Sequence, residues 1–300
     1  MAHFKNKLAP IFMALIAAAV FSACGGSGQP ALDSSGQALK RSPVFTTDQK
    51  YKDVTIKFGA NSIASASEML KKRGELAAYL KAELGVRDVE IMLARDYDQA
   101  LKQLINHETD ISWLGAISYV RGSERNKLIP LVKPIVNGAT FYRSAIITRS
   151  DGAIKTLSDL RGKKVAWVDK NSTSGYLMAK ALMREAGIDA DRDLAETDFV
   201  GNHTAVVLNV LLGEMDAGVC YLGAQNVLVD PVKIARIKVI ATTREISTEP
   251  ITCTDSFPVE LRDRVTEAFL RLNENGNPKF TKASDSDYNS IREVMKLLNF

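Results

Sequence analysis

The order of apolar and polar residues predicts alternating strands and helices from residue 54 onward. Patterns with the helical period of 3.6 residues lie at 67–85 and 96–108. Short apolar runs of strand character flank these helices, at 54–60, 89–95 and 110–116. Because strands that alternate with helices usually pair in parallel, this half of the chain predicts a parallel sheet covered by helices on both faces.

A second set of elements follows, and two extended segments join it to the first. Strands are expected at 143–151, 163–169, 197–203, 216–222 and 238–243. Helices are expected at 174–186, 204–214, 259–275 and 287–300. The segments at 143–151 and 238–243 are the expected crossings, so we predict an α/β protein of two lobes around a cleft. Lobe 1 would hold residues 53–138 and 247–300, and lobe 2 would hold residues 139–246.

The first residues predict export rather than a place in the fold. Lys5 and Lys7 precede a short apolar run that ends in "FSAC" at Cys24, which is typical of a secretory signal over residues 1–23. The run is too short for a transmembrane helix, which needs about 20 apolar residues. Residues 24–52, rich in Gly and Ser at their start, predict a flexible tether.

Composition and charge exclude several classes of protein. Hydrophobic residues make up 46% and charged residues 25% of the 300, as in a globular protein with an ample core. The formal charge is +4, and removing residues 1–23 leaves +2. No block of Lys or Arg concentrates that charge, so we expect no nucleic-acid partner. The His and Cys residues lack metal-ligand spacing, so no metal site or cofactor is expected; Cys220 and Cys253 can be paired or free.

The stretch "DKNSTSGYLMAKALMREAG" (169–187) carries the most specific chemical pattern. It places Ser172, Thr173 and Ser174 between a predicted strand and a predicted helix. One hydroxyl would suffice to cap the helix. Three of them, together with the unpaired N–H groups and the positive end of the helix dipole, can hold several oxygens of one anion. Gly175 would leave the backbone open to close approach. Capping and anion binding both remain open on these residues alone.

A second strand-to-helix turn favours anion binding over simple capping. Asn202 and His203 lie at another strand-to-helix turn, where a histidine can donate a hydrogen bond to an anion. Tyr97 begins a helix of the first lobe, where on its own it is better explained as a core aromatic. A Ser174–His203–Asp169 triad can be drawn, but Asp169 lies on the same loop as the serine, and the motifs of common hydrolases and nucleotide-binding enzymes are absent. We therefore expect a binding protein and no catalytic residues.

Six segments in this order resemble the phosphate, phosphite and phosphonate-binding proteins of ABC transporters, the periplasmic phosphonate-binding family. They are "KFGANSIA", "RDYDQALKQLINHETDISWLGAISYV", "FYRSAIITRSD", "LSDLRGKKVAWVDKNSTSGYL", "GNHTAVVLNVLLGEMDAGVCY" and "TEPITCTDSFP". The resemblance covers about residues 53–300. It implies a type II periplasmic-binding-protein fold, each lobe a mostly parallel sheet flanked by helices, with the two crossing segments as a hinge. The position of Cys24 similarly resembles the lipobox of bacterial lipoproteins, in which that cysteine is acylated.

The resemblance also implies a set of ligand-binding residues. Ser172, Thr173 and Ser174 would hold the phosphorus oxygens and His203 would complete the ring. Asp169 and Asn171 would shape the loop. Tyr97 and Tyr142 match positions where the family places tyrosines on the ligand from the other side, and Trp113 lies in a segment that lines the cleft in family members. Family members that take aminoalkyl phosphonates pair the ammonium with acidic residues. Here one such position falls near Gly223, which offers no charge, and the other near Glu249, which can. Phosphite, phosphate or a short alkyl phosphonate fits at least as well.

The implied function is that of an exported, lipid-anchored receptor. It would act as a monomer that captures a phosphorus oxyanion in the interlobe cleft and delivers it to an ABC transporter permease, held at a membrane through Cys24. The alternative is a sensor of the same fold that reports its ligand to a membrane histidine kinase.

Overall fold

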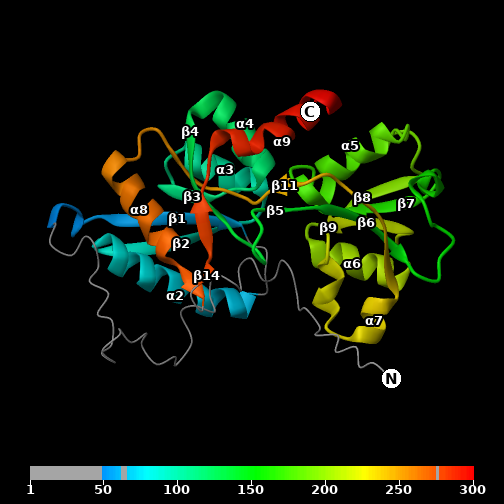
Figure 1. Ribbon diagram of the computed structural model, residues 1–300, viewed down its shortest axis with the longest axis horizontal. Coiled ribbons are helices and arrows are strands. Elements are labelled where there is room, and N and C mark those ends of the chain that lie inside the picture. Colours follow the sequence, from blue (N-terminus) through cyan, green and yellow to red (C-terminus); the bar gives the residue numbers. More distant parts are fainter. Residues whose placement is uncertain (1–48, 62–65, 275–276) are drawn as a thin grey trace, which may run out of the picture. The chain divides into compact units, whose positions relative to one another are not determined.

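The chain folds into two compact units, here called unit 1 and unit 2 (Figure 1). A computed structural model describes residues 49–61, 66–274 and 277–300. Unit 1 is residues 143–245, and the described residues on either side form unit 2. The chain passes into unit 1 after Tyr142 and leaves it after Glu245. The expected boundaries, after residues 138 and 246, differ because Phe141–Tyr142 (β5) pairs with Ile246–Ser247 (β11) inside unit 2.

Unit 2 is built on a six-stranded sheet in the order β15-β4-β12-β3-β1-β2. Its strands are β1 (Thr55–Asn61), β2 (Asp88–Ala94), β3 (Ile111–Trp113), β4 (Leu128–Pro134), β12 (Ile251–Thr254) and β15 (Phe280–Lys282). Its helices are α2 (Ala66–Leu84), α3 (Tyr97–Ile105), α4 (Ala116–Asn126), α8 (Val259–Arg271) and α9 (Asn289–Leu298). Short elements complete it: η1 (Gln49–Tyr51), β13 (Asn273–Glu274), β14 (Asn277–Pro278) and η5 (Asp285–Tyr288).

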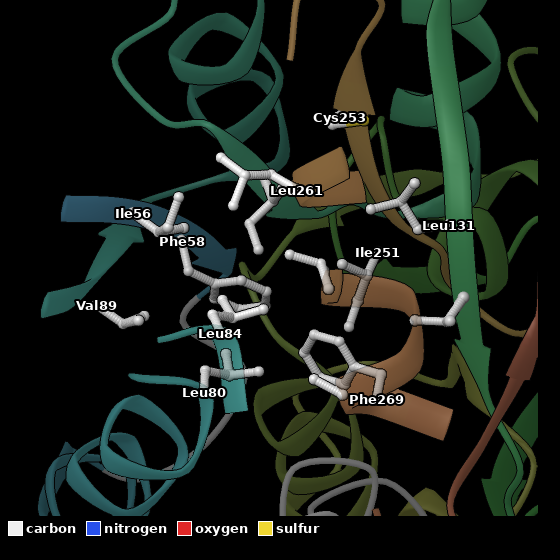
Figure 2. Packing of buried hydrophobic residues seen from close by; sticks show 14 of the residues in the cluster. Ile56, Phe58, Leu80, Leu84, Val89, Leu131, Ile251, Cys253, Leu261 and Phe269 are labelled. Carbon is white, nitrogen blue, oxygen red and sulfur yellow. The ribbon is translucent and has the colours of Figure 1, made fainter. Parts of the chain in front are cut away.

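The main core of unit 2 lies between the sheet and two helices. Phe58 of β1 and Ile251 of β12 point toward Leu80 of α2 and Phe269 of α8 (Figure 2). Helices α2 and α8 pack against each other on this face, and α3 and α4 cover the other face (Figure 1). Burying a side chain of this size contributes about 1.5–3 kcal/mol each. The predicted order 54–116 therefore forms as expected, with β1 parallel to both β2 and β3.

Unit 1 is built on a five-stranded sheet in the order β10-β6-β9-β7-β8. Its strands are β6 (Ser144–Arg149), β7 (Lys164–Trp167), β8 (Glu196–Phe199), β9 (Ala217–Tyr221) and β10 (Ile237–Thr242). Its helical elements are η2 (Leu157–Leu160), η3 (Thr173–Leu177), α5 (Met178–Glu185), α6 (His203–Leu212), η4 (Ala224–Leu228) and α7 (Pro231–Ala235). Helix α5 lies on one face of the sheet, and α6 lies on the other (Figure 1).

Both sheets are mixed: most strands of each sheet run in one direction, as expected, while β6 of unit 1 and β12 and β15 of unit 2 run opposite to them. In unit 1, β7 is parallel to β8 and β9, whereas β6 runs antiparallel to β9 and β10. In unit 2, β12 is antiparallel to β3 and β4. The antiparallel strands are mainly those that follow a passage between units, because a strand entering from the other unit runs opposite to the βαβ strands beside it.

The start of the folded part and the state of two cysteines also bear on the sequence expectations. Tyr51, within the expected tether, is buried in the unit 2 core, and its hydroxyl donates to Glu260 (3.0 Å), so the folded part begins before residue 53. The signal, Cys24 and most of the tether lie outside the described residues. Cys220 is buried in unit 1 and Cys253 in unit 2, and both are free thiols. Among the described helices none is long and apolar enough to cross a bilayer.

Candidate functional site

The hydroxyl-rich turn follows β7 directly, at the carboxyl end of the strand. Asp169 shapes it: its carboxylate accepts from the Asn171 N–H (2.7 Å), and its carbonyl accepts from the Ser172 N–H (2.9 Å). Asn171 is itself buried. These two bonds fold the chain back over the strand end, so the next three residues begin a helix at the carboxyl edge of the sheet. Ligands of open α/β sheets bind at this edge.

Ser172 is the N-cap of this helix, and its first turn is a π-helical turn rather than the α-helix expected from residue 174. The Ser172 Oγ accepts from the Gly175 N–H (3.0 Å). The N–H groups of Leu177 and Met178 bond to the carbonyls five residues earlier, those of Ser172 and Thr173. Because a hydroxyl also carries one proton, Ser172 can cap the helix and still donate to a ligand. Turns of this type occur frequently at functional sites.

Thr173 and Ser174 bring two more hydroxyls to the same turn. Ser172, Thr173 and Ser174 are 1%, 3% and 2% exposed, although all three side chains are polar. Burying hydroxyls costs free energy unless they have partners, and one helix cap requires only one of them. The first turn also carries the positive end of the helix dipole. Three buried hydroxyls at a helix start are therefore suited to the oxygens of one anion.

Gly175 is required for a reason that differs from the expected one. A Cβ on this residue would lie 2.4 Å from the Cβ of Val168 and 2.8 Å from the Ser172 Oγ. Its N–H is already bonded to Ser172, and its carbonyl accepts from the Val168 N–H (3.1 Å). The glycine therefore lets the turn lie close on the end of β7. The expectation that its missing side chain opens the backbone to a ligand is wrong, because the position of that side chain faces Val168 and Ser172.

His203 lies at the start of α6, capped by Asn202, whose side chain accepts from the Ala205 N–H (2.8 Å). The ring is 6% exposed and packs edge-on against Tyr221, with ring centroids 4.8 Å apart. Its Nδ1 accepts from the Tyr221 N–H (3.3 Å), which fixes the proton on Nε2. Burial lowers the pKa of His203 to about 3, so the ring is neutral at physiological pH. Within the part of the chain that the structure describes, the buried Nε2 has no hydrogen-bond partner.

A chain of contacts brings this histidine to the same edge of the sheet as the hydroxyl turn. The Ser144 Oγ lies 2.5 Å from the carbonyl oxygen of Ser174 and 3.3 Å from that of Cys220. The peptide that carries the Cys220 carbonyl also carries the Tyr221 N–H that bonds His203. Ser144 pairs with Tyr221 in the β6–β9 ladder. The turn and His203 are therefore neighbours at the carboxyl ends of β7 and β9.

This geometry does not suit the catalytic triad drawn from the sequence. A triad histidine donates from Nδ1 to a carboxylate and takes a proton at Nε2. Here Nδ1 accepts a backbone N–H, and the Asp169 carboxylate bonds to Asn171 instead. The lowered pKa of His203 also makes it a weak base. Ser174 and His203 can instead act as hydrogen-bond donors, through the serine hydroxyl and the histidine Nε2–H.

The remaining predicted residues belong to unit 2. The Tyr142 hydroxyl donates to the Glu249 carboxylate (2.8 Å); burial raises the pKa of Glu249, and this bond opposes the shift. The Tyr97 ring covers Gly115, where a Cβ would lie 2.8 Å from it, at the start of α4. Trp113 packs edge-on to Phe280 beside the unit 2 core. Trp113 is therefore at least partly a core residue.

Sequence reasoning missed Ser144 and the Tyr221 N–H. Neither has a local signal, because each acts through a partner at least 18 residues away in the chain. Among the described residues, the structure also has no cluster of His, Cys, Asp or Glu that could hold a metal ion.

Comparison with known proteins places the chain in a family. A solved phosphonate ABC transporter binding protein of Pseudomonas aeruginosa has a TM-score of 0.72 at 20% identity, covering 82% of this chain and 86% of that one. PhnD1 of Prochlorococcus marinus, solved with methylphosphonate, also has 0.72, at 19% identity over 82% and 98% of the two chains. These likenesses show the type II binding-protein fold.

At the level of sequence, the phosphate-import protein PhnD of Mycolicibacterium smegmatis is 28% identical over 283 residues, which are 90% of this chain and 82% of that protein. Residues 58–295 match the family described as the periplasmic substrate-binding proteins of phosphonate ABC transporters. That match spans most of both units, and the chain belongs to this family.

Proposed function

We propose that the protein captures a small phosphorus oxyanion through neutral hydrogen-bond donors of unit 1. The donors are the hydroxyls of Ser172, Thr173 and Ser174 and the Nε2–H of His203. One observation carries the proposal: three buried hydroxyls at a helix start share a sheet edge with a buried histidine whose Nε2 has no described partner. An anion supplies an acceptor for the Nε2–H of His203, and the nearby hydroxyls can donate to the same anion.

Phosphate, phosphite or a short alkyl phosphonate is the ligand class that we propose. The mycobacterial relative is named for phosphate import, and the Prochlorococcus marinus protein was solved with methylphosphonate. An aminoalkyl phosphonate is less favoured because Gly223 has no side chain and the Glu249 carboxylate already accepts from Tyr142. Tyr97, Tyr142, Trp113 and Glu249 are proposed as a second group of ligand contacts, and that part stays a prediction.

We further propose that the protein is exported, held at a membrane through Cys24, and hands its ligand unchanged to an ABC permease. Family membership supports the transporter partner. The basic and apolar pattern of residues 1–23, which ends before Cys24, supports export and acylation. A neutral His203 bonded to a backbone N–H supports binding without chemistry.

The proposal is tested by calorimetric titration of the protein without residues 1–36. The panel is phosphate, phosphite, methylphosphonate, 2-aminoethylphosphonate, sulfate and arsenate. We expect clear binding of at least one of the phosphorus oxyanions. Thr173→Val should weaken it about tenfold to hundredfold, because a hydrogen bond to a charged group contributes roughly 1.5–3 kcal/mol.

Thr156→Val is the matched control. Thr156 is the N-cap of η2, and its hydroxyl donates to the Asp159 carboxylate (3.0 Å). Because η2 precedes β7 and the proposed donors follow it, loss of this hydroxyl should alter stability and leave affinity unchanged. Failure of every anion in the panel to bind, or equal affinity of wild type and Thr173→Val, would remove the turn as the binding site.

A further inference from the structure

Ser144 is the first residue of β6, immediately after the chain enters unit 1, and it is fully buried. Beside it lies Thr243, which follows β10 shortly before the chain leaves unit 1. The Ser144 N–H donates to the Thr243 Oγ1 (3.0 Å), and the Thr243 N–H donates to the Ser144 carbonyl (3.1 Å). These reciprocal bonds fix the backbone of Ser144 and leave its hydroxyl to point into the unit.

That hydroxyl lies between two carbonyls that belong to the proposed binding residues. It is 2.5 Å from the carbonyl of Ser174, inside the π-helical turn, and 3.3 Å from the carbonyl of Cys220. A hydroxyl has one proton, so the shorter contact is the main hydrogen bond. The carbonyl of Ser174 and its own side chain are attached to the same Cα. Holding the carbonyl therefore sets the direction in which the Ser174 hydroxyl leaves the backbone.

We propose that Ser144 is a positioning residue for anion binding: its hydroxyl holds the Ser174 carbonyl and keeps the hydroxyls of the π-helical turn in one orientation. A π-helical turn has one residue more per bonded ring than an α-helical turn and is rare, so a contact from outside the turn can help to select it over the α-helical alternative. Ser144 supplies that contact from the start of β6. The inference rests on the proposed function of the same turn.

An alanine at position 144 would fit the same space, because it removes only the oxygen. The buried Ser174 carbonyl would lose this donor, which costs free energy unless the turn rearranges to find another. A rearranged turn would no longer present its three hydroxyls together. The expected result is weaker binding even though Ser144 itself does not touch the ligand.

The test is a double-mutant cycle on affinity for the tightest-binding anion among phosphate, phosphite and methylphosphonate. We expect Ser144→Ala to weaken binding at least about threefold, with Ser144→Cys in between because a thiol is a weaker donor. Ser174→Ala should weaken binding strongly in the wild-type protein. In the Ser144→Ala background the fold-loss of affinity caused by Ser174→Ala should be at least about three times smaller, because the effects of substitutions at interacting residues are not additive.

Thr148→Ala is the matched control. Thr148 is a buried residue of the same strand whose hydroxyl bonds to the Arg149 carbonyl, so its cycle with Ser174→Ala should be additive. A purely structural role of Ser144 would lower the melting temperature but give an additive cycle, and that outcome would overturn the inference.

Amide hydrogen exchange of the ligand-free protein provides a second readout. In Ser144→Ala the Leu177 and Met178 N–H groups, which bond to the carbonyls of Ser172 and Thr173, should exchange faster than in wild type and in Thr148→Ala. Unchanged exchange would also overturn the inference. If the wild-type protein binds no anion of the panel, the proposed function is wrong, and so is a role of Ser144 in binding. The hydrogen-exchange comparison then still shows whether Ser144 holds the turn.

Discussion

At the scale of single residues, His203 links the protonation of a side chain to the stability of the fold. Burial lowers its pKa to about 3, whereas an unfolded histidine has a pKa near 6.5. Below pH 6.5 the unfolded chain therefore binds a proton that the folded protein does not bind. Acid then favours the unfolded state, so the contribution of His203 is full above pH 6.5 and is lost as the pH falls toward 3.

The prediction is a loss of about 2 kcal/mol of unfolding free energy from this residue between pH 8 and pH 5. His203→Gln has no titrating group and should lack this component. Urea denaturation of the two ligand-free proteins at both pH values gives the difference directly. Equal pH dependence in the two proteins would mean that His203 protonates normally in the folded state.

The residues of the site differ in how far the sequence could predict them. Ser172, Thr173 and Ser174 stand together after an apolar strand, and their crowding is itself the signal. Ser144 stands alone in a strand, and its role depends on the register that places it opposite Tyr221. Such a contact is set by sheet pairing over a long stretch of chain, which no local pattern encodes.

At the scale of elements, the close approach of η3 to β7 depends on Gly175. Alanine there would bring a Cβ within 2.4 Å of Val168, and backbone atoms or a β-branched side chain must move to admit it. We expect Gly175→Ala to destabilise the protein by about 1–3 kcal/mol and to weaken anion binding, because the turn itself must shift.

The matched control is Gly74→Ala, at an exposed position inside α2 where a Cβ would meet no atom within 4 Å. An extra methyl group there should stabilise the helix by up to about 1 kcal/mol and leave binding unchanged. Chemical denaturation and titration of both variants test the contrast. Two substitutions with the same sign of stability change would contradict the packing argument.

Elements with regular patterns were predictable, and those decided by tertiary contacts were not. The segment 128–134 is not among the expected strands, and it contains Pro130, Lys133 and Pro134, residue types that are disfavoured inside a sheet. The structure nevertheless places β4 between β12 and β15. The Lys133 ammonium is buried there beside the Asp287 carboxylate (3.0 Å) and the Ser247 hydroxyl (3.2 Å). Only the folded chain brings those partners together.

At the scale of the whole molecule, the proposed binding and anchoring functions lie in different parts of the chain. All the proposed ligand contacts fall between residues 97 and 249, whereas the proposed acylation site is Cys24. The protein has three cysteines, and the other two are buried. Burial raises the pKa of Cys253 to about 12 and that of Cys220 further, which leaves both as thiols rather than reactive thiolates.

Acylation in cells should therefore depend on Cys24 alone. With an alkyne fatty acid supplied to expressing bacteria, we expect the wild-type protein to be labelled and to sediment with membranes, and Cys24→Ser to lose both properties. Cys253→Ala, which removes a buried thiol, should keep the label. Because the proposed ligand contacts all fall between residues 97 and 249, purified Cys24→Ser should bind the anion with wild-type affinity. Label that persists in Cys24→Ser would place the anchor elsewhere and contradict the lipoprotein assignment.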